Sequence, residues 1–345
     1  MNNAFTIWST RADLAQKGLT THFAAPWPQF LNNWSTPIDG SNDVFNYWWL
    51  AHTMDVRLDA YERTSDQQWL QQAQLTRKNL LERNGGTLFN DYFDDMLWFG
   101  LALERLGRIG KDDTAISDAI ALWRHCRTNG WNDTYGWSMA WRTSQLDYKN
   151  TPANGPFSIL GARLYELTGN EEYLNEAMDG FDWITRTLRC DSGFIHDGIN
   201  RLGDGTIDIQ WRFTYNQGLY IGAGTALAQA TGDHSYLDAV TETIHAALTT
   251  LTCGEVFVSE GDGGDEGLFK GIFYRYALTF LQAHPDSTLA GFMGASAEAL
   301  WAHSCSTQDS FLPGNDWSRP PTDPIPYSTY LSAIMALEAM AALMG

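Results

Sequence analysis

Two adjacent acidic residues, Asp94 and Asp95, are the part of this sequence whose type and spacing best suit chemistry. They lie in NDYFDDMLWFGLALERLG, residues 90–107, at the start of a long apolar run. Neighbouring residues in one helical turn have Cβ atoms roughly 5 to 6 Å apart, so their carboxyl groups can approach the ~5 to 5.5 Å separation of retaining glycosidases. Like charges at that distance push the two proton affinities apart. Such a pair can supply a nucleophile and a general acid.

The same pair has a structural interpretation that these two residues alone leave open. Asp91 or Asp94 could cap a helix N-terminus, and Asp95 in the first turn would then interact favourably with the helix dipole. The sequence contains a second pair, Asp112 and Asp113, that is typical of a surface helix start. The dipeptide alone is therefore a weak signal, and the surrounding residues must distinguish a catalytic role from a structural one.

Helical periodicity extends along the whole chain. The same boundary pattern occurs three times, in ERTSDQQWLQQA (62–73), ELTGNEEYLNEA (166–177) and QATGDHSYLDAV (229–240). In each, one helix ends at a Thr-Gly or Thr-Ser turn and the next begins with acidic residues. It indicates a repeated helical hairpin. We predict twelve helices, over residues 3–22, 43–62, 66–83, 92–107, 112–127, 153–168, 171–189, 214–230, 233–250, 266–283, 287–304 and 326–343.

The twelve predicted helices alternate in character. The even-numbered ones are apolar on most faces, whereas the odd-numbered ones carry a polar stripe. Six buried and six half-exposed helices in alternation predict an all-α fold, an (α/α)6 toroid or barrel of six inner and six outer helices, rather than a four-helix bundle or a solenoid. No Ser/Gly-rich or Pro-rich linker divides the chain, so we expect residues 1–345 to form one domain.

The polar residues of the inner helices are concentrated at their N-terminal ends. They are Asn42, Asp43, Asn46, Asp94, Asp95, Asn154, Tyr215, Asn216, Gln217, Lys270 and Ser328. If these helices run parallel, the residues gather at one rim, where free backbone N–H groups also point. The segment RLGDGTIDIQW, residues 201–211, predicts a short β-hairpin at that rim with a turn at Asp204-Gly205.

Aromatic residues accompany these polar ends, a combination that suits sugars. Sugar C–H faces stack on flat rings, and sugar hydroxyls bond to amides and carboxylates. Any one of the 15 tryptophans equally suits a core role, but we favour the loop-borne Trp137, Trp211 and Trp317 for a ligand role.

Composition restricts the partners. With 22 basic and 41 acidic residues and a net charge of -19, the chain should repel nucleic acid and anionic membranes, so a neutral ligand fits best. No metal-binding or phosphate-loop motif occurs, and we expect no cofactor. The four cysteines, Cys126, Cys190, Cys253 and Cys305, are scattered, which predicts reduced, buried thiols. We expect a monomer.

The two chain ends give two further expectations. MNNAFTIWSTRADLAQKG lacks a basic region followed by an apolar one, so we predict a cytoplasmic protein without a secretory signal. The apolar segment 330–345 is too short to span a bilayer and contains Glu338.

The surroundings of the paired aspartates are more specific than the pair. DYFDDMLWFGLALERL resembles the Tyr-x-Asp-Asp-x-x-Trp-x-x-Leu-Ala-Leu signature of glycoside hydrolase family 76, the endo-α-1,6-mannanases. The resemblance spans about residues 40–280 and continues through GWSMAWR (136–142), KNTPANGPFSILGARLYELTGNEEYL (149–174), HDGI (196–199), WRFTYNQGLYIGAGTALAQATGDHSYL (211–237) and LFKGIFYRY (268–276). It implies an (α/α)6 toroid that hydrolyses α-1,6-mannosidic linkages with retention, without metal or cofactor.

The resemblance also implies residue roles. Asp94 corresponds to the nucleophile and Asp95 to the general acid/base. The implied substrate-binding residues are Tyr92, Trp137, Asn154, Asp197, Trp211, Tyr215, Asn216, Gln217 and Lys270. Two of these residues also have a structural alternative: Asn216 could be a helix N-cap, and Lys270 could form a salt bridge to a carboxylate.

This chain departs from the family in two respects. Met96 to Phe99 differ from the residues often expected after the paired aspartates, which bears on subsites rather than chemistry. The missing export signal favours a short, imported oligosaccharide as substrate. Two alternatives remain: a glycosidase of this fold for another α-linked neutral oligosaccharide, and a glycan-binding protein without activity. The intact Asp94-Asp95 pair argues against the latter.

Overall fold

The computed structural model describes residues 3–36, 38–261, 264–306, 310–322 and 324–345. The chain folds into two compact units. Unit 1 comprises Met1–Gly86 and Leu251–Gly345, and unit 2 comprises Thr87–Thr250. The expectation of one domain over residues 1–345 stays a prediction.

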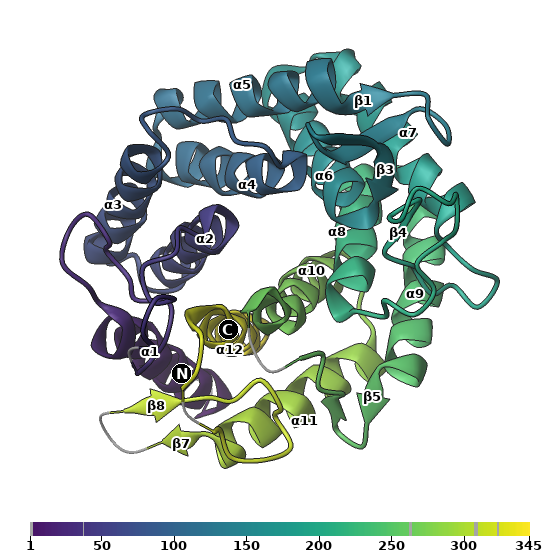
Figure 1. Ribbon diagram of the computed structural model, residues 1–345. Coiled ribbons are helices and arrows are strands. Elements are labelled where there is room, and N and C mark those ends of the chain that lie inside the picture. Colours follow the sequence, from purple (N-terminus) through teal and green to yellow (C-terminus); the bar gives the residue numbers. More distant parts are fainter. Residues whose placement is uncertain (1–2, 37, 262–263, 307–309, 323) are drawn as a thin grey trace. The chain divides into compact units, whose positions relative to one another are not determined.

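Unit 2 contains two layers of helices (Figure 1). In one layer, α4, α6 and α8 are buried over most of their length, whereas α5, α7 and α9 of the other layer bury one face. Each buried helix packs against the helix that follows it in the chain. The bounds are Phe93–Gly110 for α4, Asp113–Gly130 for α5, Thr151–Thr168 for α6, Glu171–Thr187 for α7, Thr214–Thr231 for α8 and Ser235–Thr250 for α9.

The connection between α6 and α7 shows why the repeated boundary pattern produces a helical hairpin. Helix α6 ends at Gly169, whose φ of 69° is the left-handed conformation that glycine adopts without steric penalty. Asn170 then caps α7 by accepting a hydrogen bond from the Glu172 backbone N–H, and Glu171 and Glu172 lie in the first turn. The predicted helical hairpin is confirmed at this position.

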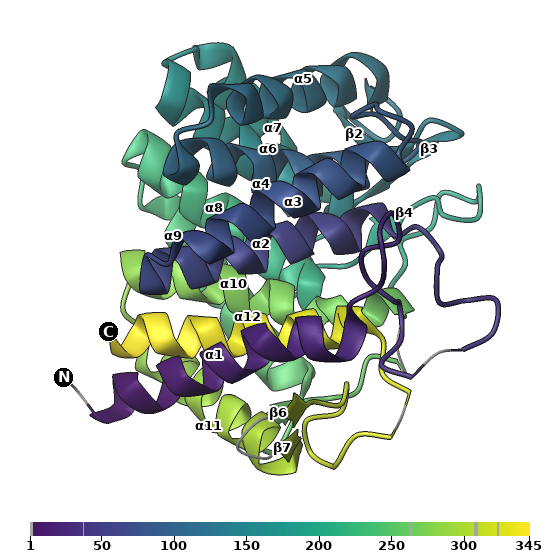
Figure 2. The same cartoon turned by 90° about the vertical axis from the view of Figure 1, so that its left-hand side faces the viewer.

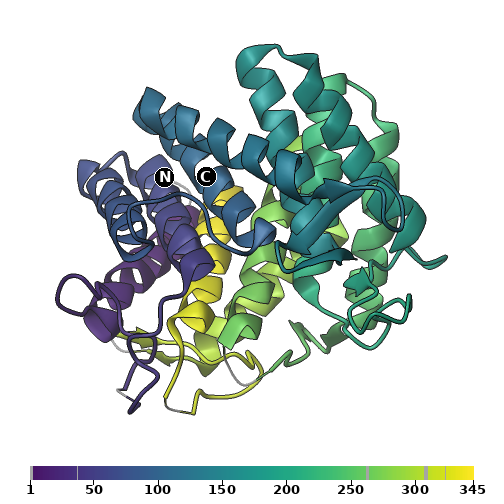
Figure 3. The same ribbon diagram turned by 45° about the horizontal axis from the view of Figure 1, so that its top comes forward.

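Unit 2 also contains an antiparallel sheet that the sequence analysis did not predict. Its strands, in the order β1-β2-β3-β4, are Trp131–Asn132, Ser138–Arg142, Gln145–Asn150 and Gly198–Ile199. Strand β2 packs on α4, α5 and α6, and Figure 3 shows the sheet against the blue and teal helices of this unit. The predicted hairpin near Asp204-Gly205 is present as a loop that continues from β4 and is closed by a bridge between Ile199 and Ile207.

Unit 1 has the same two kinds of helix, with α2, α10 and α12 more buried than α3 and α11. Helix α1 lies along α12, and the start of α1 and the end of α12 are at the same end of this pair (Figure 2). The bounds are Asn3–Phe23 for α1, Tyr47–Thr64 for α2, Gln67–Arg83 for α3, Gly264–Leu268 for the 3-10 helix η1, Phe269–Ala283 for α10, Ser287–His303 for α11 and Tyr327–Met344 for α12. Two ribbons pair β5 (Thr252–Cys253) with β6 (Val256–Phe257) and β7 (Cys305–Ser306) with β8 (Phe311–Leu312).

Two helix starts differ from the predictions. Helix α2 begins at Tyr47 rather than at residue 43, and α10 begins at Phe269 after η1. The indole N–H groups of Trp48 and Trp49 both donate to Asp265 Oδ1, at 2.9 and 2.8 Å. This contact joins the first turn of α2 to η1. It depends on residues more than 200 positions apart, so local pattern could not place these boundaries.

Three further expectations are wrong in whole or in part. Helix α12 has 18 residues and is long and apolar enough to cross a membrane, although 83% of it is buried inside the protein as in a core helix. Trp317 is buried against Tyr274 instead of lying open for a ligand. All four cysteines are free, but Cys253 and Cys305 are exposed.

Gly155→Ala and Gly291→Ala should have opposite effects on stability. A Cβ at position 155 of α6 would lie 2.8 Å from the Leu219 Cβ of α8, so overpacking should lower the free energy of unfolding by about 1 to 3 kcal/mol. At position 291 of α11 a Cβ would meet nothing within 4 Å. Because alanine has the better helix propensity, Gly291→Ala should raise the free energy of unfolding by about 1 kcal/mol. Urea unfolding measures both; equal shifts would contradict the close approach of α6 to α8.

Candidate active site

Asp94 and Asp95 lie in the first turn of α4, and both are half-buried. The N-cap of this helix is Tyr92, which makes no side-chain cap hydrogen bond. Asp94 Oδ1 accepts a hydrogen bond from the Asp95 backbone N–H at 3.0 Å. The interpretation of Asp91 or Asp94 as an N-cap is therefore wrong.

A second donor reaches Asp94 from the sheet. The Trp141 indole Nε1 on β2 donates to Asp94 Oδ2 at 3.1 Å. The Trp141 ring packs edge-on against Tyr92, with centroids 5.4 Å apart, and the Arg142 guanidinium lies 4.4 Å from its centroid. Each oxygen of Asp94 thus accepts a hydrogen bond from a fixed N–H group, and such bonds stabilise the ionised carboxylate.

Asp95 has a different partner. Its Oδ2 accepts from the Asn90 side-chain amide at 3.0 Å, while Asn90 Oδ1 accepts from the Tyr92 backbone N–H at 2.8 Å. Asn90 therefore orients the Asp95 carboxyl group relative to the start of α4. The donor here is a neutral amide in the loop before the helix.

The position of β2 depends on two buried side chains. Asn154 of α6 accepts from the Met139 N–H at 2.8 Å and donates to the Met139 and Asn150 carbonyls at 2.9 and 2.8 Å. Lys149 Nζ donates to the Ser138 carbonyl at 2.6 Å and to that of Asn132 at 3.1 Å. Burial lowers the pKa of Lys149 to about 7. Asn154, a predicted substrate ligand, is fully buried and bonds to backbone.

A buried carboxylate, Asp197, forms a second polar cluster in unit 2. Its Oδ1 accepts from the Tyr215 hydroxyl at 2.7 Å and from the Asn216 amide at 3.1 Å. Its Oδ2 lies 2.8 Å from the Tyr148 hydroxyl and pairs with Arg201. Burial raises the pKa of Tyr215 well above its ordinary value, and the charges of Asp197 and Asp94 add to this effect. The phenol therefore remains a hydrogen-bond donor at neutral pH.

Arg201 connects this cluster to the exposed rim. Its Nε donates to Asp208 at 3.1 Å, and its guanidinium lies 3.8 Å from the Trp211 ring centroid. Burial raises the pKa of Asp208, although Arg201 counteracts the shift. Trp211 is 40% exposed and Trp137, in the turn between β1 and β2, is 61% exposed. These two predicted ligand residues offer ring surface to solvent, as a sugar platform requires.

The remaining predicted ligands occupy other environments. Gln217 is buried, and its side-chain amide bonds to both backbone groups of Ile195. It accepts from the Ile195 N–H at 2.9 Å and donates to the Ile195 carbonyl at 2.7 Å. The N-cap of α8 is Phe213, so the N-cap interpretation of Asn216 is wrong. Lys270 lies in unit 1, where it donates to the Asn315 carbonyl at 3.0 Å and lies 3.8 Å from Glu260. The salt-bridge interpretation of Lys270 agrees with this contact.

Unit 2 thus brings together Tyr92, Asp94 and Asp95 with the aromatic Trp141, and Asp197 with Tyr215 and Asn216. The sequence analysis did not single out Asn90, Tyr148, Arg201 or Asp208. The strand pair that carries Trp141 and Tyr148 was readable as two short extended segments around the Thr143-Ser144 turn. Within the described residues, no group of three or more His, Cys, Asp or Glu side chains could hold a metal ion.

Comparisons with known proteins bear on the family and the fold of the chain. A family model described as glycosyl hydrolase family 76 matches residues 7–345. The structure of the Lin0763 protein from Listeria innocua is 45% identical, with a TM-score of 0.94 over 97% of each chain. An inactive variant of an α-1,6-mannanase from Salegentibacter sp. HEL1_6, with two consecutive aspartates changed to asparagine, binds α-1,6-mannotriose; it is 34% identical, with a TM-score of 0.90 over 97% of this chain and 99% of that one.

A curated relative covers less of the chain. The mannan endo-1,6-alpha-mannosidase DCW1 of Saccharomyces cerevisiae is 28% identical over 200 residues, which are 54% of this chain and 44% of that protein. The chain therefore matches less than half the length of this relative. The predicted fold class is confirmed, since the described residues contain twelve α-helices and the solved relatives in this family are (α/α)6 barrels.

Lys149→Met should change how stability depends on pH. Folded Lys149 loses its proton near pH 7 and the unfolded residue near 10.5, so between these values the unfolded state binds more protons. This group therefore makes the free energy of unfolding rise as pH increases from about 7 to about 10. The variant should lack that rise when urea unfolding is measured at several pH values across this range.

The matched control is Lys78→Met, which removes a 64% exposed lysine of α3 and should keep the wild-type pH dependence. A Lys149→Met profile parallel to wild type would show that burial of this amine does not set the slope.

Proposed function

The chain belongs to glycoside hydrolase family 76, and we propose that it is a retaining endo-hydrolase of α-1,6-mannosidic linkages in mannan or manno-oligosaccharides. The observation that carries this proposal is the Asp94-Asp95 pair, with Asp94 held between the Asp95 N–H and the Trp141 indole. The inactive Salegentibacter variant, which carries two consecutive aspartate substitutions, supports it. The α-1,6 linkage and the endo mode in this proposal are taken from the relatives named above.

The contacts of the two carboxyl groups fit two different roles. Two N–H donors stabilise negative charge on Asp94, as a nucleophile requires. Asp95 Oδ2 accepts a hydrogen bond from the Asn90 amide, which orients this carboxyl group for the proton exchange that the proposal assigns to it. The negative charge of Asp94 beside it favours the protonated form of Asp95 before reaction.

In the proposed first step, Asp95 donates its proton to the glycosidic oxygen while Asp94 attacks the anomeric carbon. The bond between that carbon and the leaving oxygen breaks, and a β-mannosyl ester forms on Asp94. In the second step, Asp95 removes a proton from water, whose oxygen attacks the anomeric carbon and displaces Asp94. The product has the α configuration, and both aspartates return to their first states.

The half-exposed aromatic rings supply binding surface in this proposal. Trp137 and Trp211 would stack against mannosyl units, and Tyr92 lies directly at the helix start that carries the aspartates. Asn154 and Gln217 would act by positioning, because their amide groups bond to backbone in the sheet and in the segment before α8.

Asp94→Asn and Asp95→Asn should each lower the hydrolysis of α-1,6-manno-oligosaccharides by about 1,000-fold or more, on the order of the loss seen when a covalent catalyst is removed. Proton NMR of the wild-type reaction should show the α anomer first. The control Asp113→Asn changes an exposed aspartate at the start of α5 and should keep full activity. A β anomer formed first, or activity that survives both site substitutions, would exclude the mechanism.

Trp141→Phe should lower kcat about 10- to 100-fold, because a hydrogen bond to a charged group contributes about 1.5 to 3 kcal/mol. Steady-state kinetics measures it. The matched control is Trp183→Phe, which removes an indole hydrogen bond to the Tyr135 carbonyl, at 2.8 Å, without touching either aspartate. If the two variants retain equal kcat, the Trp141 bond to Asp94 has no part in the reaction.

A further inference from the structure

One side chain of unit 2, Arg201, lies between two buried carboxylates and the partly exposed ring of Trp211. It belongs to the loop after β4, and its side chain is 19% exposed. The proposed reaction assigns a role to Trp211 but none to Arg201. The contacts on the two sides of the guanidinium indicate what this arginine does for the ring.

On the buried side, the guanidinium is bound to both carboxylates. Arg201 Nη2 pairs with Asp197 Oδ2, and Arg201 Nε donates to Asp208 Oδ2 at 3.1 Å. The Tyr148 hydroxyl lies 2.8 Å from the same Asp197 oxygen and 3.1 Å from the same Asp208 oxygen. It has one proton, so it can donate to only one of them at a time. Arg201 donates to both, and the two carboxylates therefore hold its planar head group in one orientation.

The backbone around Arg201 is fixed as well. Asn200 has a φ of 73°, in the left-handed region that asparagine tolerates better than most residues. Its side-chain amide donates to the Asp147 carbonyl at 3.0 Å, and its Oδ1 accepts from the Gly205 N–H at 2.8 Å. The Arg201 carbonyl accepts from the Gln145 amide at 3.0 Å. The arginine thus has an anchored backbone and an anchored head group.

On the other side, the guanidinium covers one face of the Trp211 ring. Arg201 Cζ lies 3.8 Å from the ring centroid, which is van der Waals contact for a group above the ring plane and too close for a group beside the ring edge. Among the described residues, one other aromatic ring contacts Trp211: Phe213, with centroids 5.8 Å apart and ring planes at 84°. Because Arg201 closes one face of the 40% exposed Trp211, a sugar ring can stack only on the opposite face.

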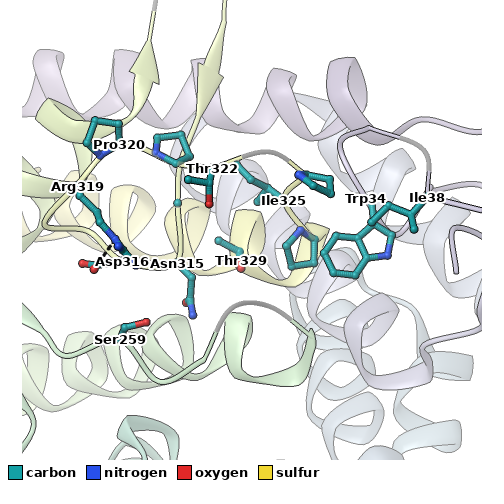
Figure 4. A pocket seen from close by; sticks show the side chains of 14 residues that line it. Trp34, Ile38, Ser259, Asn315, Asp316, Arg319, Pro320, Thr322, Ile325 and Thr329 are labelled. Atoms are coloured by element: carbon teal, nitrogen blue, oxygen red, sulfur yellow. Dashed lines mark ion pairs between the residues drawn. The ribbon is translucent and has the colours of Figure 1, made fainter.

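An arginine of unit 1 shows how these contacts differ from an ordinary surface ion pair. Arg319 lines a cavity there, and its Nε pairs with Asp316 at 2.9 Å (Figure 4). The Arg319 side chain is 66% exposed, and among the described residues it packs on no aromatic ring. An exposed pair of this kind contributes little to stability. Arg201, in contrast, is mostly buried and has an ion pair on one side and a ring on the other.

The stack with Arg201 prepares the Trp211 ring for a ligand. A ring that is held before the ligand arrives loses less side-chain freedom when the ligand binds. A stacking surface also contacts the substrate in the ground state and in the transition state alike, so it lowers KM and leaves kcat unchanged.

We propose that Arg201 is a positioning residue of the proposed reaction: it is anchored to Asp197 and Asp208, and it holds Trp211 so that the uncovered face of the ring is presented to the substrate. This proposal rests on the proposed function, in which Trp211 stacks against the substrate. A lysine in place of Arg201 would keep the positive charge, but it lacks the planar group that stacks on the ring and reaches both carboxylates.

Steady-state kinetics of Arg201→Lys with α-1,6-mannotetraose tests the proposal. The variant keeps a positive charge beside the two buried carboxylates and should fold, which thermal unfolding verifies. KM should rise about 3- to 10-fold, as expected when one more side chain must be ordered on binding, and kcat should stay within about twofold of wild type. The matched control is Arg186→Lys in α7. This arginine also pairs with an aspartate four residues away, but its side chain is 76% exposed, so KM should not change.

A double-mutant cycle shows whether Arg201 acts through Trp211. Trp211→Ala alone should raise KM about tenfold. The Arg201→Lys/Trp211→Ala double variant should have the KM of Trp211→Ala, because a residue that acts by holding the ring has no effect once the ring is removed. Asp208→Asn removes one anchor of the guanidinium and keeps its shape. It should raise KM in the same direction as Arg201→Lys, and only while Trp211 is present.

Fluorine NMR of the full chain labelled with 5-fluorotryptophan reports on the ring itself. Trp211→Phe assigns the Trp211 resonance. Arg201→Lys should move this resonance towards its position in the unfolded chain, whereas Arg186→Lys should leave it in place.

Four results would overturn the role of Arg201 and leave the proposed function standing, provided that the wild-type chain hydrolyses the tetrasaccharide. They are an unchanged KM in Arg201→Lys, a fall in kcat without a rise in KM, KM increases that multiply in the double variant, and an unmoved Trp211 resonance. A wild-type chain that does not hydrolyse α-1,6-mannotetraose would overturn the proposed function and this proposal with it.

Discussion

The hydrogen bond from the Trp141 indole to Asp94 is the contact on which the candidate active site depends. This bond joins strand β2 to the first turn of α4, a helix that is buried over most of its length. It can form only if β2 has a fixed position relative to the start of α4. Asn154 and Lys149 provide that fixation by bonding to the backbone of Met139 and Ser138. These two buried residues therefore affect the position of the Asp94 carboxylate without touching it. A half-buried site gains from such support, because hydrogen bonds are stronger where water is partly excluded.

The Asp197 cluster shows how unit 2 accommodates a second carboxylate beside this site. A buried charge is tolerated when donors satisfy its oxygens, and here Tyr215, Asn216 and Arg201 do so. Tyr148 connects the two clusters: its hydroxyl lies at Asp197, and its ring packs edge-on against Trp141, with centroids 5.6 Å apart. Through this aromatic contact, the orientation of Asp94 depends on residues in β3 and in the loop after β4.

Unit 1 and unit 2 place their polar groups by the same principle. In each, the helices with long apolar stretches are buried, so polar side chains accumulate at helix starts, where backbone N–H groups lack partners within the helix. In unit 2 those starts contain Asp94, Asp95 and Tyr215. In unit 1 they contain Thr329, together with the contact between Asp265 and the two indoles of α2. The same constraint thus underlies the proposed reaction and the contact at the start of α2.

The sequence by itself determined the helices and led to the proposed catalytic pair. Apolar periodicity, Thr-Gly ends and acidic first turns are local signals, and they located all twelve helices to within a few residues. Residues 90–103 carried enough family-specific pattern to single out Asp94 and Asp95. Only the tertiary structure decided which polar residues support the pair. Asn154 and Asn216 are both amides near helix starts, yet one bonds to strand backbone and the other to Asp197. Their partners lie 15 and 19 residues away in other elements, and packing rather than local sequence selects such partners.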